Sequence, residues 1–111
     1  LRGHQVADAQ GLVEFETLFP GWYTPRAPHV HVKALIAGRD QVSTQLYFPQ
    51  QLSDEVAALA PYRERGPSPF TNRTDFALAK STGAPGAWPR IVRNYQSIHA
   101  SLAIGILPPS A

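Results

Sequence analysis

Two histidines separated by a single residue, His29 and His31, are the side chains of this sequence best placed to do chemistry together. On a β-strand, residues i and i+2 face the same side, so the two imidazoles would lie side by side. Such a pair can chelate one metal ion, and iron, copper, nickel and zinc all accept imidazole. A His-x-His pair is equally consistent with two partly exposed strand histidines that bind nothing. The metal interpretation therefore depends on other groups converging on the pair.

A tyrosine and an arginine precede the two histidines in a loop rich in proline and glycine. Tyr23 lies six residues before His29, where the loop can fold back over the same strand face. Tyr23 could serve as an iron ligand, since tyrosinate is a hard anionic donor that is known to bind iron. Alternatively, Tyr23 could be a tyrosine that covers the core. Arg26 would bring a permanent cation close to the metal, where it could stabilise an anion, or it would form a surface ion pair.

The elements that must position these residues are expected to be mainly strands. Eleven prolines and eight glycines, spread over 111 residues without a repeat, disfavour a helical bundle and favour short strands joined by turns. The expected strands are 3–6 and 13–17, which form a hairpin around a turn at 8–11, followed by 29–37, 42–48 and 98–106. Ser53 is expected to cap a short helix that ends near Pro61. Loops are expected at 62–75 and 81–89, and a frayed tail at 108–111.

Composition excludes several classes of protein. The sequence has no cysteine, which rules out disulfides, zinc–thiolate sites and thiol nucleophiles. Ten Lys and Arg residues stand against eight Asp and Glu, and they are dispersed, so no nucleic-acid partner is predicted. No apolar run approaches the roughly 20 residues of a membrane span. The chain begins at Leu1 without a methionine, so localisation, cytoplasmic or secreted, cannot be read from this terminus.

The stretch around the histidines carries a family resemblance. Gly-Trp-Tyr at 21–23, Arg26 and His-x-His at 29–31, followed by Gln45 within 44–48, resemble the intradiol ring-cleavage dioxygenases. These are catechol and protocatechuate dioxygenases with non-haem ferric iron, and the single-domain, often secreted branch is the most similar. The likeness extends over nearly the whole chain, through Leu1-Arg2-Gly3, Asp54-Glu55-Val56, Thr71-Asn72 and the Leu-x-Ile-Gly motif at 102–105.

The resemblance implies an all-β fold, an Ig-like or Greek-key-like β-sandwich with one or two short helices, spanning 1–111 as a single domain. It also implies a ferric site of two tyrosinates and two histidines. By this resemblance, Tyr23 would be a dissociable tyrosinate ligand, and His29 and His31 would be the imidazole ligands. Arg26 would stabilise the anionic substrate, and Gln45 would lie just outside the ligands. Trp22 would form a wall of the substrate pocket.

The implied activity is that of an oxidoreductase in the catabolism of aromatic compounds. A small aromatic diol of the catechol type would react with O2, and the ring would open to a muconate-type dicarboxylate that contains both oxygen atoms. Neither a nucleic acid nor a membrane is expected as a partner.

One ligand of the implied site has no counterpart in the sequence. In the family the first tyrosinate lies upstream of the Leu-Arg-Gly segment, so the chain corresponds to the C-terminal part of such a domain, without the upstream strands. Tyr47, Tyr62 and Tyr95 do not fall at the matching place in the order. Three explanations stay open: a truncated sequence, a homo-oligomer or partner chain that completes the site, or a degenerate relative that serves as a non-catalytic β-sandwich binding module.

Overall fold

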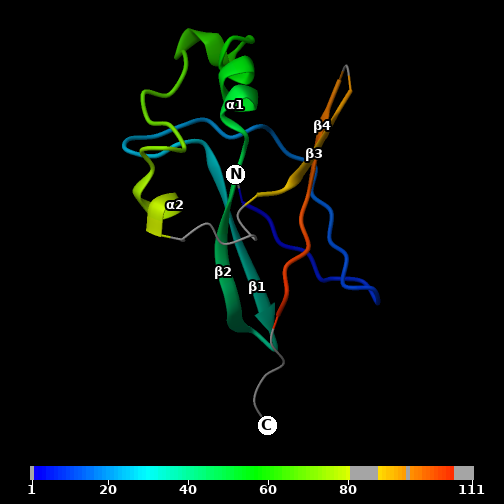
Figure 1. Ribbon diagram of the computed structural model, residues 1–111. Helices are drawn as coiled ribbons and strands as arrows, with labels where there is room; N and C mark the ends of the chain where they lie inside the picture. The colour runs from blue at the N-terminus through cyan, green and yellow to red at the C-terminus, as the bar shows by residue number, and fades with distance from the viewer. Residues whose placement is uncertain (1, 81–87, 95, 107–111) are drawn as a thin grey trace.

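The chain folds as two separate antiparallel hairpins with a helical segment between them (Figure 1). This computed structural model describes residues 2–80, 88–94 and 96–106. The first hairpin pairs β1 (His29–Ile36) with β2 (Arg39–Tyr47), and the second pairs β3 (Arg90–Arg93) with β4 (Ile98–Ser101). Between them lie α1 (Gln50–Ala57), the 3-10 helix η1 (Tyr62–Glu64) and α2 (Phe76–Lys80). The described part agrees with the all-β class, whereas the sandwich stays a prediction, because two two-stranded sheets do not by themselves make one.

The turn between β1 and β2 is a two-residue connection. Ala37 and Gly38 both have positive φ, 51° and 76°, which is the backbone of a type I′ turn. Such a turn matches the twist of the strands that it joins, and Gly38 adopts it without a Cβ penalty. The predicted strand at 29–37 is confirmed, and the one at 42–48 begins three residues earlier than expected, at Arg39.

The strand register gives the β1–β2 hairpin two unlike faces. One face carries apolar and small side chains in the cross-strand pairs Val30–Leu46, Val32–Thr44 and Ala34–Val42. The opposite face carries His29 opposite Tyr47 and His31 opposite Gln45. Because side chains alternate along a strand, this one register places all four of the latter residues on the same face.

A small core holds α1 against the end of β2. Leu52 and Val56, four residues apart and hence on one helix face, are buried together with Phe48. Four partly buried residues pack against these three: Phe19, Val30, Tyr62 and Ile91. The core therefore joins the loop before β1, both hairpins and the helical segment.

The predicted start and end of the first helix are wrong. The helix α1 begins at Gln50, with Pro49 before it, and Ser53 lies inside it rather than at its cap. The reason is that Pro49 presets φ near −50° and is followed by two glutamines, which are good helix formers. Ser53 is buried, and its Oγ has no hydrogen-bond partner within the described residues. The helix ends at Ala57, before the expected stop near Pro61.

The N-terminal segment keeps its predicted turn but not its predicted strands. Asp8 Oδ1 accepts hydrogen bonds from the backbone N–H groups of Gln10 and Leu12, both at 2.9 Å, and Gly11 has φ 81°. Beyond this turn the arms 3–6 and 13–17 are not regular strands. The side chain of Gln5 bonds the backbone of residue 14 instead of a strand ladder. The predicted strands are therefore wrong in the described structure.

The remaining differences concern the second half of the chain. The predicted long strand at 98–106 is regular only as far as Ser101, and β3 was not predicted. The loop expected at 62–75 contains η1, and α2 follows it directly. Of the loop expected at 81–89, residues 81–87 lie outside the described residues, as does the predicted tail at 108–111.

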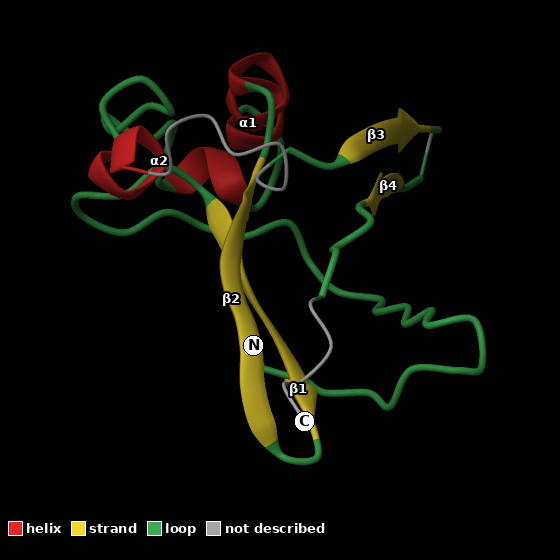
Figure 2. Ribbon diagram, turned by 60° about the horizontal axis from the view of Figure 1, so that its bottom comes forward, coloured by secondary structure: helices red, strands yellow, loops and turns green. Residues whose placement is uncertain are grey.

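The chain has a large surface for its mass. Its accessible area is 8799 Å², whereas a compact monomer of 12.1 kDa exposes about 6,000 Å². Its radius of gyration is 15.2 Å, against about 13 Å for a compact domain of this length. Figure 2 shows the reason: the β1–β2 hairpin projects away from the helices, and β3–β4 stands apart from it. Within the described residues no helix has the length and apolar character needed to cross a bilayer.

Candidate metal and substrate site

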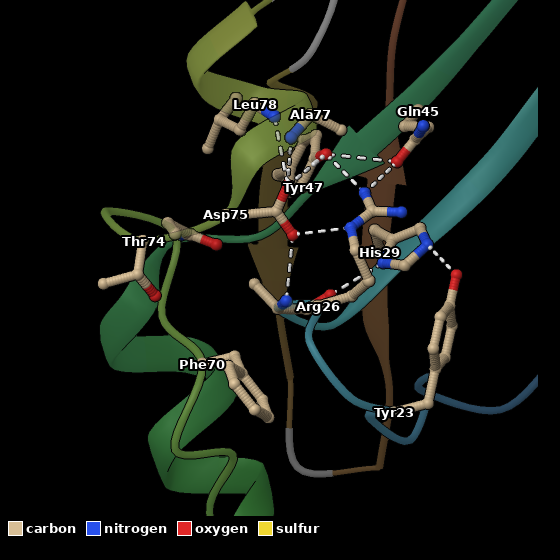
Figure 3. A network of polar contacts seen from close by, with 12 residues as sticks. Tyr23, Arg26, His29, Gln45, Tyr47, Phe70, Thr74, Asp75, Ala77 and Leu78 are labelled. Atoms are coloured by element: carbon tan, nitrogen blue, oxygen red, sulfur yellow. Dashed lines mark hydrogen bonds and ion pairs between the residues drawn. The ribbon is translucent and has the colours of Figure 1, made fainter.

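Three potential metal donors meet where the loop before β1 enters the strand. Arg26 N–H donates to Tyr23 O at 2.7 Å, which closes a turn that brings Tyr23 back over the start of β1. Tyr23 Oη lies 2.9 Å from His29 Nε2, and His29 Nε2 lies 3.2 Å from His31 Nε2 (Figure 3 shows the Tyr23–His29 contact). We call these three residues the donor triad. The strand alternation thus places the two imidazoles as predicted, and the turn adds the phenol.

The ring of His29 is fixed in the tautomer that a metal ligand requires. Its Nδ1–H donates to Ala27 O at 2.7 Å, which leaves the Nε2 lone pair directed at Tyr23 and His31. Burial lowers the pKa of His29, and the nearby positive charge of Arg26 lowers this pKa further. The ring is therefore kept neutral, and a neutral ring can donate to a cation.

The spacing of the donor triad suits a single metal ion. Metal–nitrogen and metal–oxygen bonds of about 2.1 Å place neighbouring ligands about 3 Å apart when they meet the metal at right angles. The observed separations of 2.9 Å and 3.2 Å match that value. Within the described residues no three His, Cys, Asp or Glu side chains form a cluster that could hold a metal, and the third potential donor beside the two histidines is the phenol of Tyr23.

The donor triad is anchored at one end and open at the other. His29 is 7% exposed, whereas Tyr23 is 50% exposed and His31 is also exposed. A small molecule can therefore reach the triad from solvent on the side of Tyr23. Tyr23 and His31 are thus the two exposed donors of the triad, and His29 is the buried one.

A buried cation lies beside the triad. Arg26 is 6% exposed, and its Nη2 donates to Tyr47 Oη at 2.8 Å and also to Gln45 Oε1. Its Nε donates to Asp75 Oδ2 at 2.9 Å. Burial alone would lower the pKa of Arg26, but the bond and the charge of Asp75 raise it, so the guanidinium is permanently charged. The register positions of Gln45 and Tyr47, opposite the two histidines, place this network on the site face of the hairpin.

Comparison with known proteins gives one match, to a solved structure. No family model and no curated protein matches the chain. A solved structure does match: an intradiol ring-cleavage dioxygenase from Tetranychus urticae, with a TM-score of 0.73 and 27% sequence identity, over 83% of this chain. The resemblance to the intradiol ring-cleavage dioxygenases is confirmed. The chain spans 45% of the length of that solved structure.

Trp22, which the resemblance places at the substrate pocket, makes its hydrogen bond and ring contacts away from the donor triad. The indole Nε1–H donates to Gly66 O at 3.1 Å, and the guanidinium of Arg65 stacks 3.7 Å over the ring. Trp22 lines a cleft of about 180 Å³ that the 19–22 loop forms with α1 and the 61–68 segment. Within the described part of the chain, the contacts of Trp22 are with this segment and with Phe70 rather than with the donor triad. Its role at a dioxygenase substrate pocket stays a prediction.

Two residues of the network were not predicted from the sequence. Tyr47 follows Gln45 by two residues and so shares its strand face, a signal that was present in the alternation. Asp75 precedes the apolar run 76–79 and could have been identified as a helix cap. Nothing in the sequence links it to Arg26, which lies 49 residues earlier. That contact exists only because the 62–75 segment folds back onto the start of β1.

Proposed function

We propose that this chain binds non-haem Fe(III) through Tyr23, His29 and His31 and takes part in the intradiol cleavage of catechol-type rings by O2. The observation that carries the proposal is the convergence of the donor triad, with the ring of His29 held in the ligand tautomer. The solved dioxygenase that the chain resembles supports it. The product would be a muconate-type dicarboxylate, in which the bond between the two hydroxyl-bearing carbons is broken and both atoms of O2 are retained.

Ferric iron bound here would supply Lewis acidity that lowers the pKa of a chelated catechol hydroxyl, together with the redox chemistry that makes the ring reactive towards O2. The chain's own residues have distinct tasks. His29, fixed by Ala27, would keep its position throughout the reaction. Tyr23, half exposed, would move aside for the incoming diol and take up one of its protons at Oη.

Arg26 would stabilise negative charge on the oxygens of the substrate. Its Nε and Nη2 are engaged by Asp75, Tyr47 and Gln45, whereas Nη1 makes no hydrogen bond within the described residues. Figure 3 shows the nitrogen that makes no drawn contact turned away from Asp75. A charged donor that is preorganised in a partly desolvated place stabilises a developing anion without reorganising.

The other described tyrosines do not offer a further ligand. The hydroxyl of Tyr47 bonds Asp75 and Arg26, and that of Tyr62 donates to Phe19 O at 2.7 Å. Tyr95 lies outside the described residues. We propose that a second anionic ligand comes from a segment or a chain beyond the described residues, because two neutral imidazoles hold Fe(III) weakly once Tyr23 has moved.

Spectroscopy of the iron-loaded chain tests the proposal. Adding Fe(III) should produce a tyrosinate-to-iron charge-transfer band in visible light, and catechol should shift this band under anaerobic conditions. Admitting air should then give slow oxygen uptake, with one O2 consumed per ring opened. The variant Tyr23→Phe should lose the band, whereas Tyr62→Phe should keep it. A chain that stays colourless with iron, and takes up no oxygen with catechol, would rule the function out.

A further inference from the structure

The carboxylate of Asp75 is wholly buried and joins three segments of the chain. Its two oxygens accept hydrogen bonds from different sets of partners. Oδ2 accepts from Arg26 Nε at 2.9 Å and from Ala27 N–H at 3.0 Å. Oδ1 accepts from Tyr47 Oη at 3.1 Å and from the backbone N–H groups of Ala77 and Leu78, both at 3.0 Å. Figure 3 shows all five contacts reaching this one side chain.

We propose that Asp75 is a positioning residue for the reaction: it fixes the plane of the Arg26 guanidinium, so that Nη1, which makes no hydrogen bond within the described residues, stays available to the substrate. The inference rests on the proposed function. Asp75 makes no hydrogen bond to Tyr23, His29 or His31 in the described structure. Its hydrogen-bonded link to the site runs through Arg26.

The hydrogen bonds around the Arg26 guanidinium show how Asp75 can set its orientation. An arginine side chain is long and flexible, and its fork must be held at more than one nitrogen to have a defined plane. Asp75 engages Nε, while Tyr47 engages Nη2. The same Asp75 carboxylate also holds Tyr47 and the backbone of Ala27, so it supports Nε directly and Nη2 through Tyr47, while Gln45 Oε1 is a further acceptor for Nη2.

A helix-capping role alone does not account for this arrangement. Capping of α2 uses Oδ1, and a neutral Asn or Ser would cap equally well. The contact with Arg26 uses Oδ2 and needs a negative charge, because a buried guanidinium without a counter-ion is strongly unfavourable. The two roles therefore depend on different atoms, and substitution can separate them.

The variant Asp75→Asn makes this separation. Its amide oxygen can keep the three donors at the Oδ1 position, which leaves the amide N–H₂ facing the N–H groups of Arg26 and Ala27. Thr74→Ala, in the residue before Asp75, is the matched control. It removes the hydroxyl that accepts a hydrogen bond from Thr71 N–H at 3.0 Å, and it leaves every hydrogen bond of Asp75 and Arg26 in place.

Iron content, catechol turnover and NMR of the Arg26 Nε–H group give three separate measurements. We expect Asp75→Asn to bind as much iron as the wild type and to keep the tyrosinate band. Its kcat for catechol should fall at least about tenfold, with KM changed much less, because Arg26 keeps its charge but is no longer held in the orientation that stabilises the developing anion. Its Arg26 Nε–H should exchange with solvent as rapidly as that of the exposed Arg39. Thr74→Ala should match the wild type in all three.

The NMR measurement keeps the inference separate from the proposed function. If the wild-type chain binds iron but does not turn over catechol, the function fails, and exchange at Arg26 alone decides the role of Asp75. An Arg26 Nε–H as unprotected as that of Arg39 in the wild type would overturn the inference without any variant. So would an Asp75→Asn chain with protected Arg26, or one with unprotected Arg26 and unchanged kcat in an active enzyme.

Discussion

His29 and His31 present the same atom, Nε2, to the candidate metal position but differ in how their rings are held. His29 is buried and bonded to Ala27, whereas His31 is exposed. Deleting either imidazole leaves the ion with an incomplete protein shell, so His29→Ala and His31→Ala should each lose most of the bound iron. Metal analysis after desalting measures this, with His99→Ala, on exposed β4, as the control. Iron content equal to the wild type in both variants would contradict a metal role for the pair.

The ionisation of Asp75 should make the stability of the chain depend on pH in the acid range. Burial alone would raise the pKa of Asp75, but hydrogen bonds from Arg26, Leu78 and Ala27 outweigh it and lower the pKa to about 2. The unfolded state then binds the proton more readily, so the contribution of this group is complete above about pH 4 and is lost as the pH falls towards 2.

Urea unfolding between pH 6 and pH 2 measures that dependence. The shift in the pKa of Asp75 corresponds to about 2 kcal/mol of the free energy of unfolding. Asp75→Asn should be less stable than the wild type at pH 6 and should lose less stability on acidification. Parallel curves for the two chains would show that the Arg26–Asp75 pair contributes nothing that depends on the charge.

At the scale of elements, the sequence was informative where a single element carries the pattern. Alternation alone placed His29 and His31 on one strand face, and it predicted both strands of the first hairpin. It could not give the register that sets Gln45 opposite His31, because that register follows from the Ala37–Gly38 turn. A contact over 49 residues, such as that between Arg26 and Asp75, has no local signature at all.

The failed predictions have a common physical cause. Ser53 has the chemistry of a cap, yet burial of Leu52 and Val56 and the break at Pro49 set where α1 begins. The 13–17 segment has the alternation of a half-buried strand, but no ladder forms along it in the described structure. Local preference was overridden by packing in the first case and was not supported by packing in the second.

The unpaired hydroxyl of Ser53 gives a prediction for α1. A buried hydroxyl without a partner loses its hydration, and serine is also a poorer helix former than alanine. Ser53→Ala should therefore raise the free energy of unfolding by about 1 kcal/mol, as measured by urea or thermal unfolding. Ser43→Ala, on the exposed part of β2, should change it by much less. Destabilisation by Ser53→Ala would mean that the hydroxyl has a partner in solution.

At the scale of the whole molecule, the described chain covers its apolar surface poorly. It exposes roughly 2,800 Å² more than a compact protein of its mass, which exceeds the area that a typical stable interface buries. Large apolar side chains contribute to this surface in the N-terminal segment, at the end of β1 and on the second hairpin, including Phe15, Leu18, Leu35, Ile36, Val92 and Ile98. Each two-stranded sheet also has outer edges that no other described strand covers.

Uncovered apolar surface and open strand edges favour association, because pairing buries both. We therefore predict that the 111-residue chain self-associates in the micromolar range and binds a hydrophobic dye. Sedimentation velocity over a concentration series measures the first, and dye fluorescence the second. The double variant Leu18→Ser with Leu35→Ser should weaken both without loss of iron, since the two side chains are 70% and 56% exposed and lie outside the donor triad. A chain that is monomeric at every concentration and binds no dye would show that this surface is covered in solution by its own residues.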